Sequence, residues 1–544
     1  MKQYKYTSAQ IQNEMLQAFA LGLLRDIAAS IQQAKFFSIM ADETGDVSNK
    51  EQMVICLRWV DENLEPHEDF IGIKPLKDAN AATIVALLQN TILQMGLKIE
   101  DARGQCYDGA SVMAGVKNGV AKQIKEINPR CLYTHCYGHS LNLAVGDTIN
   151  GVSYLNTTFE MIKAICKLIK RSPKKEAQLN SIKEKAGSKA KGIHTVCPTR
   201  WTVRGEACTA IISNYTYLNE LWDESLGLGP NNKNKPDSDT RAKILGAQTS
   251  MKSFKFLFGI HLNKRVLERT DMLAKRLQGY DVSAAEGAEM ARTMKLELEA
   301  QRCDSVFDQF WDVVEEDRVK FKVDQPTLPR NSNHEGPKEL YRSIYFETYD
   351  SIAATITERF DQEDFNIYQD IQEVFLKAIK GIPYNDELER ICQVYKEDIS
   401  YGDLCLELPM FVRVIPIEER EIYNVAKLFK FLKGMSRDMK LMLSGVTTLA
   451  KLMLVMPATN AESERIFSAL KRIKTYMRST TSDDRLNHIM AMHVHKERLD
   501  NVDLIKIANQ FAHGNSDRER IFGRFIDNDI AKKKKFTTQA TQTM

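Results

Sequence analysis

Strand-forming sequence is concentrated in the first 135 or so residues of the chain, and this uneven distribution constrains the fold most strongly. Apolar runs bounded by turn residues predict strands over Phe36–Met40, Met53–Val60, Phe70–Ile73, Ala102–Tyr107 and Leu132–Cys136. Helical spacing of apolar residues predicts helices over Ser8–Gln33, Ala79–Met95, Gly119–Ile127 and Ser140–Ile149. The chain therefore begins with a helix and an antiparallel meander of three strands, followed by helices that alternate with two more strands.

Long helical patterns replace the strand signal from about residue 155 to about residue 440. Val446–Met456 is a further apolar segment, and Ala461–Tyr476 is a charged helix that begins near Asn460, a favoured N-cap residue. A large helical region thus follows the α/β part. The order of elements before residue 150 is the one used by ribonuclease H-like domains, in which carboxylates lie at the ends of neighbouring strands.

The length of 544 residues excludes a single small module, since a typical domain has about 150 residues. A formal net charge of +3 does not indicate a nucleic-acid or membrane partner, so local patches must bind any such partner.

The 10 cysteines are scattered, the N-terminus has no signal-peptide core, and no apolar run approaches the ~18 residues that cross a bilayer. We therefore expect a soluble protein of a reducing intracellular compartment with no membrane partner.

Two aspartates, Asp42 and Asp108, each come just after a predicted buried strand. Strands that lie next to each other bring such side chains to one edge of the sheet, where two carboxylates suit hard cations such as Mg²⁺. A third carboxylate for a two-metal site must come from elsewhere in the chain. The alternative is that a strand-end aspartate caps a turn, which is the commoner role of any single one. Glu43 and Asp46 lack the ligand alternation of a calcium loop.

Five segments carry a resemblance to a known family. In chain order they are Phe36–Thr44, Cys106–Gly115, His135–Leu143, Thr199–Trp201 and Asn460–Ala469. Together they resemble the hAT superfamily of cut-and-paste DNA transposases, including host-genome relatives of the MYM-type zinc-finger and THAP-domain kinds. The likeness covers the chain from about residue 10 to residue 500. Family members usually carry an N-terminal zinc finger, which we expect this chain to lack.

The resemblance implies an α/β ribonuclease H-like catalytic fold of the retroviral integrase superfamily, interrupted by a large all-α insertion domain. The bounds that it implies are an N-terminal helix over 1–34, a first catalytic part over 35–155, the helical insertion over 156–440, a last catalytic part with a helical hAT dimerisation segment over 441–510, and a polar, basic tail over 511–544. It also implies that Asp42, Asp108 and Glu464 form a DDE triad that holds Mg²⁺ or Mn²⁺ for phosphoryl transfer. Glu462 points to a different side of its helix and is the less favoured ligand.

Cys136 and His139 match the Cys-x-x-His of the family, which implies that His139 lies near the active site or the bound DNA end. A role in the core or in capping is one alternative. Zinc is another, and it would need further ligands such as Cys197 and Cys208.

The resemblance also implies contacts to DNA. Trp201 matches a family residue that stacks on an unpaired nucleotide, and the neighbouring Arg200 is a candidate for a phosphate contact. Basic clusters that include Lys174, Lys175, Lys471 and Arg472 would neutralise phosphates. Packing of Trp201 in a core, and a solvated charged face for the basic clusters, are the alternatives.

The function implied is that of a nuclear hAT transposase, or of a host protein derived from one, that cleaves element ends, transfers strands to target DNA and dimerises through its C-terminal segment. The alternative is a catalytically silent regulator that keeps the fold for DNA association and dimerisation. Because all three acids are present, the enzymatic reading is favoured over a scaffold that has no physical need of them.

Overall fold

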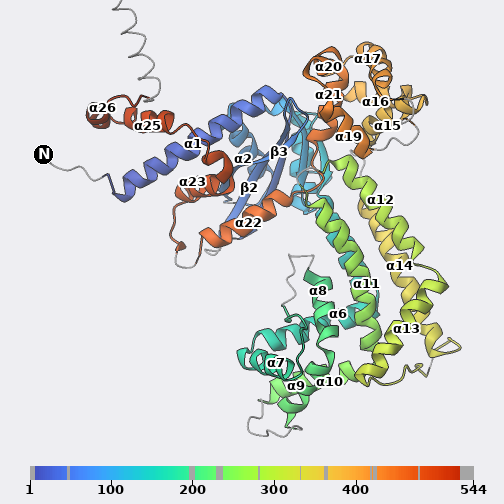
Figure 1. The fold of residues 1–544 in the computed structure, drawn as a ribbon. Helices are drawn as coiled ribbons and strands as arrows, with labels where there is room; N and C mark the ends of the chain where they lie inside the picture. The colour runs from blue at the N-terminus through green and yellow to red at the C-terminus, as the bar shows by residue number, and fades with distance from the viewer. Residues whose placement is uncertain are drawn as a thin grey trace, which may run out of the picture. The chain divides into compact units, whose positions relative to one another are not determined.

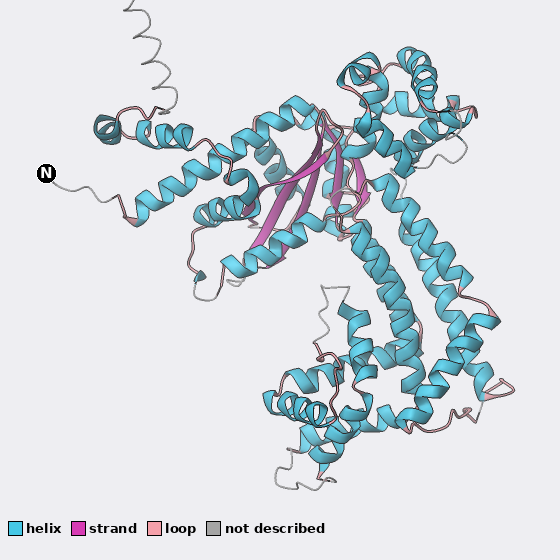
Figure 2. Cartoon of the chain, viewed as in Figure 1, coloured by secondary structure: helices cyan, strands magenta, loops and turns pink. Residues whose placement is uncertain are grey.

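The computed structural model describes residues 6–45, 50–76, 78–194, 203–227, 237–279, 282–330, 332–360, 366–416, 420, 425–475 and 478–526. The chain forms two compact units. The first contains residues 1–136, 283–285 and 363–544, and the second contains residues 137–282 and 286–362. Figure 1 labels the elements and colours the chain by residue number, with the strands in the blue of its N-terminal part, and Figure 2 shows the strands in magenta.

The first unit is built on a mixed sheet of five strands. In chain order these are β1 Phe37–Gly45, β2 Glu51–Val60, β3 Pro66–Pro75, β4 Ala102–Tyr107 and β5 Leu132–His135. Their spatial order is β3-β2-β1-β4-β5, with β1–β2 and β2–β3 antiparallel and β1–β4 and β4–β5 parallel. The meander and the two later strands that the sequence pattern predicts are confirmed.

Helices of the first unit follow the same chain order. They are α1 Ala9–Ala34, α2 Ala81–Gln94, the 3-10 turn η1 Ile99–Asp101, α3 Ser111–Ala114, α4 Val120–Ile127, α15 Asn366–Lys380, α16 Asn385–Val394, α17 Tyr401–Val414, α19 Val425–Gly434, α20 Arg437–Met442, α21 Ser444–Val455, α22 Ala461–Ile473, α23 Asp483–Val494, α24 Lys496–Leu499, α25 Leu504–His513 and α26 Ser516–Phe522. Helix α1 contacts α23 and α25, and α22 contacts β1 and β2.

Side chains alternate between the two faces of the sheet, because successive residues of a strand point in opposite directions. One face, with Ile39 and Ala41 of β1, packs against α1, α2 and α4. The other face, with Met40 of β1 and Cys106 of β4, packs against α22 and α23. Each face therefore has its own apolar core, and the second core is the one that α22 covers.

Among its described residues the second unit contains helices and connecting loops and no strand. Its helices are α5 Tyr137–Gly151, α6 Ser153–Lys170, α7 Pro173–Lys185, α8 Val203–Ser213, α9 Tyr215–Leu226, α10 Ser238–Lys252, α11 Phe254–Leu277, α13 Asp304–Phe321, α14 Pro337–Phe360 and most of α12 Ala284–Ala300. Aromatic residues fill its core, where Phe258 of α11 packs against Phe310, Trp311 and Tyr341. The large helical region that the sequence indicates is present.

One local prediction is wrong. The pattern predicts a strand that ends at Met40 with Asp42 in the turn beyond it, but β1 continues to Gly45, and Asp42 is paired with Val54 of β2. The acidic residues stay in the strand because β2 supplies backbone partners along the whole of β1. Asp42 is therefore held by the sheet itself.

Candidate active site

Asp42 lies near the C-terminal end of β1 and shares a face with Met40, two residues before it. That face is the one covered by α22. Its carboxylate Oδ1 accepts a hydrogen bond from the backbone N–H of Glu43 at 2.9 Å. The strand thus fixes a mostly buried carboxylate beneath α22.

Asp108 comes directly after β4, which runs parallel to β1. It lies two residues beyond Cys106, just as Asp42 lies two residues beyond Met40, and Cys106 and Met40 are register partners. Its Oδ1 accepts a hydrogen bond from the N–H of Ala110 at 3.2 Å, the geometry of an Asx turn. Both aspartates therefore emerge at the same edge and on the same face of the sheet.

Glu464 lies in the first turn of α22, the helix that packs on this face. Glu462, two residues earlier, accepts a hydrogen bond from Arg465 Nε at 2.7 Å. Its charge acts on Glu68, whose pKa is raised by burial against the lowering effect of Arg58. Glu464 and Glu462 thus face different surroundings, as their helical spacing predicts.

Electrostatics link the three acids. Burial raises the pKa of Asp42 to about 8, and the negative charges of Asp108 and Glu464 act in the same direction. Burial also raises the pKa of Glu464 to about 7, against the lowering effect of Arg465. The pKa of Glu43 is raised by burial and by Asp108. A buried carboxylate surrounded by others is costly unless a proton or a cation compensates it.

The donor set suits a hard divalent cation. Mg²⁺ in proteins is usually bound through one or two carboxylates and keeps several waters, and Asp42 and Asp108 supply two carboxylates. No group of three or more His, Cys, Asp or Glu side chains among the described residues is arranged to hold a metal ion. The acids that the sequence singles out thus fit a magnesium site in their chemistry, with Glu464 as a nearby charge.

Cys136 has a structural contact. It is buried directly after β5, and its Sγ accepts a hydrogen bond from the backbone N–H of Asn460 at 3.2 Å. His139 lies in α5, which belongs to the second unit. Cys208 is buried in α8 of that unit, while Cys197 lies outside the described residues. The sequence pattern does not predict this contact between Cys136 and Asn460.

The candidate DNA contacts are placed unevenly. Arg200 and Trp201 lie outside the described residues. Lys174 is exposed in the first turn of α7, and the pKa of its half-buried neighbour Lys175 is lowered by burial. Lys471 and Arg472 are exposed in the last turn of α22, where cations also complement the helix dipole.

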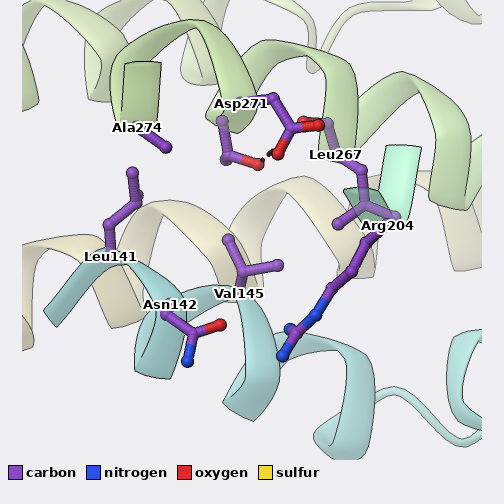
Figure 3. Close-up of a pocket in the computed structure, with 8 residues that line it drawn as sticks. Leu141, Asn142, Val145, Arg204, Leu267, Asp271 and Ala274 are labelled. Atoms are coloured by element: carbon purple, nitrogen blue, oxygen red, sulfur yellow. Dashed lines mark hydrogen bonds between the residues drawn. The ribbon is translucent and has the colours of Figure 1, made fainter. Parts of the chain in front are cut away.

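A small pocket lies within the second unit, between α5, α8 and α11 (Figure 3). Leu141, Val145 and Ala274 give it apolar walls, and Asp271 and Arg204 are its charged residues. Burial raises the pKa of Asp271 to about 7. None of the three acids lines this pocket, and all three belong to the first unit.

Comparison with known proteins gives two family matches. The model of the ZMYM1/FAM200 RNase-like domain matches residues 1–119, and the model of the hAT family C-terminal dimerisation region matches residues 430–497. The protein called 52 kDa repressor of the inhibitor of the protein kinase is 25% identical in Mus musculus and 24% identical in Homo sapiens, over 514 residues in each. Each alignment covers 91% of this chain and 66% of the relative.

The matches fall on the elements that build the site. The first contains β1 to β4 with Asp42 and Asp108, and the second contains α22 with Glu464. No helix among the described residues combines the length and the apolar character that crossing a membrane requires.

Proposed function

Because this chain is a hAT-related, transposase-derived protein, we propose that its first unit is a DDE-type catalytic centre for phosphoryl transfer on DNA. The observation that carries the proposal is the buried Asp42 carboxyl, which shares one face of the sheet with Asp108 and feels the charges of Asp108 and Glu464. A cluster of buried like charges lowers the stability of the fold, and such clusters are typical of functional sites, where a bound cation compensates the charge.

In this proposal Asp42 and Asp108 hold Mg²⁺ or Mn²⁺ through their carboxylate oxygens. Glu464 of α22 adds a third negative charge near the cation. The metal would activate the attacking water or 3′-hydroxyl and neutralise charge on the phosphate. Both aspartates are fixed by main-chain contacts, so they need little reorganisation to accept a cation.

We propose that the catalytic fold combines residues 35–155 and 441–510 with a helical insertion over 156–440, between the flanking segments 1–34 and 511–544. The first compact unit joins residues 1–136 with 363–544, which supports a catalytic fold interrupted by a helical segment. The two units divide the chain at other residues than these bounds, because the first unit includes residues 363–440 and the second includes residues 137–155. Lys174, Lys175, Lys471, Arg472, Arg200, Trp201 and His139 are the proposed DNA contacts.

Self-association is supported by the match of residues 430–497 to the hAT dimerisation region. We propose a homodimer that acts on transposon ends and target DNA in the nucleus. Basic side chains at the end of α22 follow Glu464 by two turns, which is a suitable reach for phosphates that flank a cleaved bond.

The test is cleavage, in Mg²⁺ or Mn²⁺, of DNA that carries the sequences flanking the gene. The wild-type chain is expected to nick the element end, and Glu464→Gln is expected to bind the same DNA without nicking it. Glu462→Gln is the matched control, since it removes a charge from the same helix turn. DNA binding by the wild type without any nicking would refute the enzymatic proposal.

A second candidate function is that of a catalytically silent regulator. It is favoured by the relatives, whose name describes a repressor, and by the dimerisation match. DNA association and dimer formation that both survive Glu464→Gln, together with no nicking by the wild type, would support this candidate.

A further inference from the structure

The residue before α22 does not act as the sequence pattern predicts. Asn460 occupies the N-cap position and belongs to a residue type that caps helices well, but its side chain makes no capping hydrogen bond. The side chain is instead directed to the sheet and to the helix it precedes. Because Asn460 does not make the capping hydrogen bond that its residue type favours, we expect its side chain to have a role in tertiary structure.

Asn460 makes three buried contacts. Its Nδ2 donates to the backbone carbonyl of Ala41 at 2.7 Å, and its Oδ1 accepts from the Ser463 hydroxyl at 2.7 Å. Its backbone N–H donates to Cys136 Sγ at 3.2 Å. Asn460 is 3% exposed and Ser463 is fully buried, so water is unavailable as a substitute partner.

These contacts join the elements that carry the three acids. Ala41 is the residue before Asp42 in β1, and Asn460 lies four residues, or about one helical turn, before Glu464. Cys136 follows β5, the strand paired with β4, which Asp108 follows. One side chain thus ties the start of α22 to the backbone beside Asp42.

We propose that Asn460, supported by Ser463, is a positioning residue that sets Glu464 against Asp42 for binding a divalent cation. This inference rests on the proposed function. Apolar contacts of Ile466 and Leu470 hold α22 on the sheet, but such contacts are not directional. The hydrogen bonds of Asn460 fix the helix start in position, which is how residues around a metal site orient its ligands.

A purely structural role for Asn460 is the alternative, and the first unit contains a matched control for it. Asn128 is 2% exposed, and its Nδ2 donates to the backbone carbonyls of Ile99 at 2.8 Å and Ala102 at 2.9 Å. It makes the same kind of buried contact at the opposite end of β4 from Asp108. Removing the side-chain amide of Asn460 or of Asn128 should lower stability, but only the loss of the Asn460 amide should change cation binding.

The experiment titrates Mn²⁺ into the full chain by calorimetry and measures thermal unfolding in EDTA. Variants are Asn460→Ala, Ser463→Ala, Asn128→Ala and Asp42→Asn. We expect both Asn460→Ala and Asn128→Ala to lower the unfolding temperature. Only Asn460→Ala is expected to weaken Mn²⁺ affinity, by about 10- to 100-fold. Ser463→Ala should weaken affinity less and in the same direction, and it carries the test if Asn460→Ala does not fold.

Two failures are distinguishable. Equal Mn²⁺ affinity in Asn460→Ala, Ser463→Ala and Asn128→Ala, with binding lost in Asp42→Asn, would overturn the positioning role and leave the proposed function standing. Absence of Mn²⁺ binding in the wild-type chain would overturn the proposed function and this inference with it.

Discussion

Met40 of β1 and Cys106 of β4 are register partners in a parallel strand pair, and each is followed two residues later by an aspartate. Since side chains two residues apart share a face, the pair brings Asp42 and Asp108 out on the side of the sheet that α22 covers. The same spacing in both strands turns two distant aspartates into neighbours.

Cation binding should stabilise the first unit through these acids. At a Mn²⁺ concentration 100 times its dissociation constant, the wild-type chain should gain about 2.7 kcal/mol of unfolding free energy, because the folded state alone binds the ion. Asp42→Asn should abolish the gain and Glu464→Gln should reduce it. Denaturant unfolding with and without Mn²⁺ measures the effect.

Glu462→Gln is the control for that measurement. Glu462 contacts Arg465 and acts on Glu68, so its loss should leave the Mn²⁺-dependent gain unchanged. An equal loss of the gain in Glu462→Gln and Glu464→Gln would contradict the assignment of Glu464.

The close packing of β4 beneath α21 gives a stability prediction. A Cβ on Gly104 would lie 2.3 Å from Met456 Sδ and 2.5 Å from Ser38 Oγ. Gly104→Ala should therefore cost about 1–3 kcal/mol, as overpacking a core usually does. Chemical denaturation provides the value.

Gly146 of α5 is the matching control, because nothing lies within 4 Å of a Cβ placed there. Gly146→Ala should be neutral or stabilise the helix by up to about 1 kcal/mol. Comparable destabilisation by both substitutions would show that the contacts around Gly104 are not its cause.

Much of the first unit could be predicted from the sequence, because apolar runs and helical spacing are local signals. The order of strands and helices, and the nearness of Asp42 to Asp108, follow from those signals and from the way parallel strands align. The extent of β1 does not, since Gly45 stays in the strand through pairing with Glu51 of β2. A run of acidic residues resembles a turn until its partner strand is known.

Long-range polar contacts are the other part that sequence patterns miss. Arg103 and Asp398 form a buried ion pair at 2.7 Å across 295 residues of sequence. Asn460 is a good N-cap by local rules, but Ala41 and Cys136 provide tertiary partners that outweigh the cap. In both cases the partner is set by the fold, and no local spacing points to it.

Asp271 of the second unit predicts a pH dependence of stability. Burial raises its pKa to about 7 in the folded state, above the value of 3.8 expected for an ordinary aspartate. As pH rises from about 4 to about 7, the unfolded chain releases this proton first, so stability should fall over that window and level off above it. Asp271→Asn should be more stable than wild type at pH 8, with the difference vanishing near pH 4.

Asp317 of α13 serves as the control, because its pKa is shifted in the opposite direction. The contact of Asp317 Oδ2 with His261 Nε2 at 3.2 Å lowers the pKa of Asp317. The contribution of Asp317 to stability is therefore present near neutral pH and is lost as pH falls below the ordinary range of aspartate. Tryptophan fluorescence during urea unfolding at pH 3, 4, 6 and 8 compares Asp271→Asn with Asp317→Asn. A stability difference for Asp271→Asn that does not change with pH would contradict the prediction.

Salt dependence tests whether the end of α22 contacts DNA. Lys471 and Arg472 are exposed in the last turn of the helix that carries Glu464. If each neutralises one phosphate, replacing both by alanine should lower the slope of log K against log salt concentration by up to about 1.8, because each contact contributes about 0.9. Filter binding or fluorescence anisotropy between 50 and 200 mM salt, as a rough working range, measures the slope.

The control for that slope is Lys243→Ala. Lys243 is an exposed lysine of α10 that pairs with Asp239 on its own helix, and it belongs to the second unit, which contains none of the three acids. Its loss removes the same charge as the loss of Lys471 and should leave the slope unchanged. An equal decrease in slope per lost charge in both variants would mean that DNA responds to the overall charge of the protein and that α22 makes no local phosphate contact.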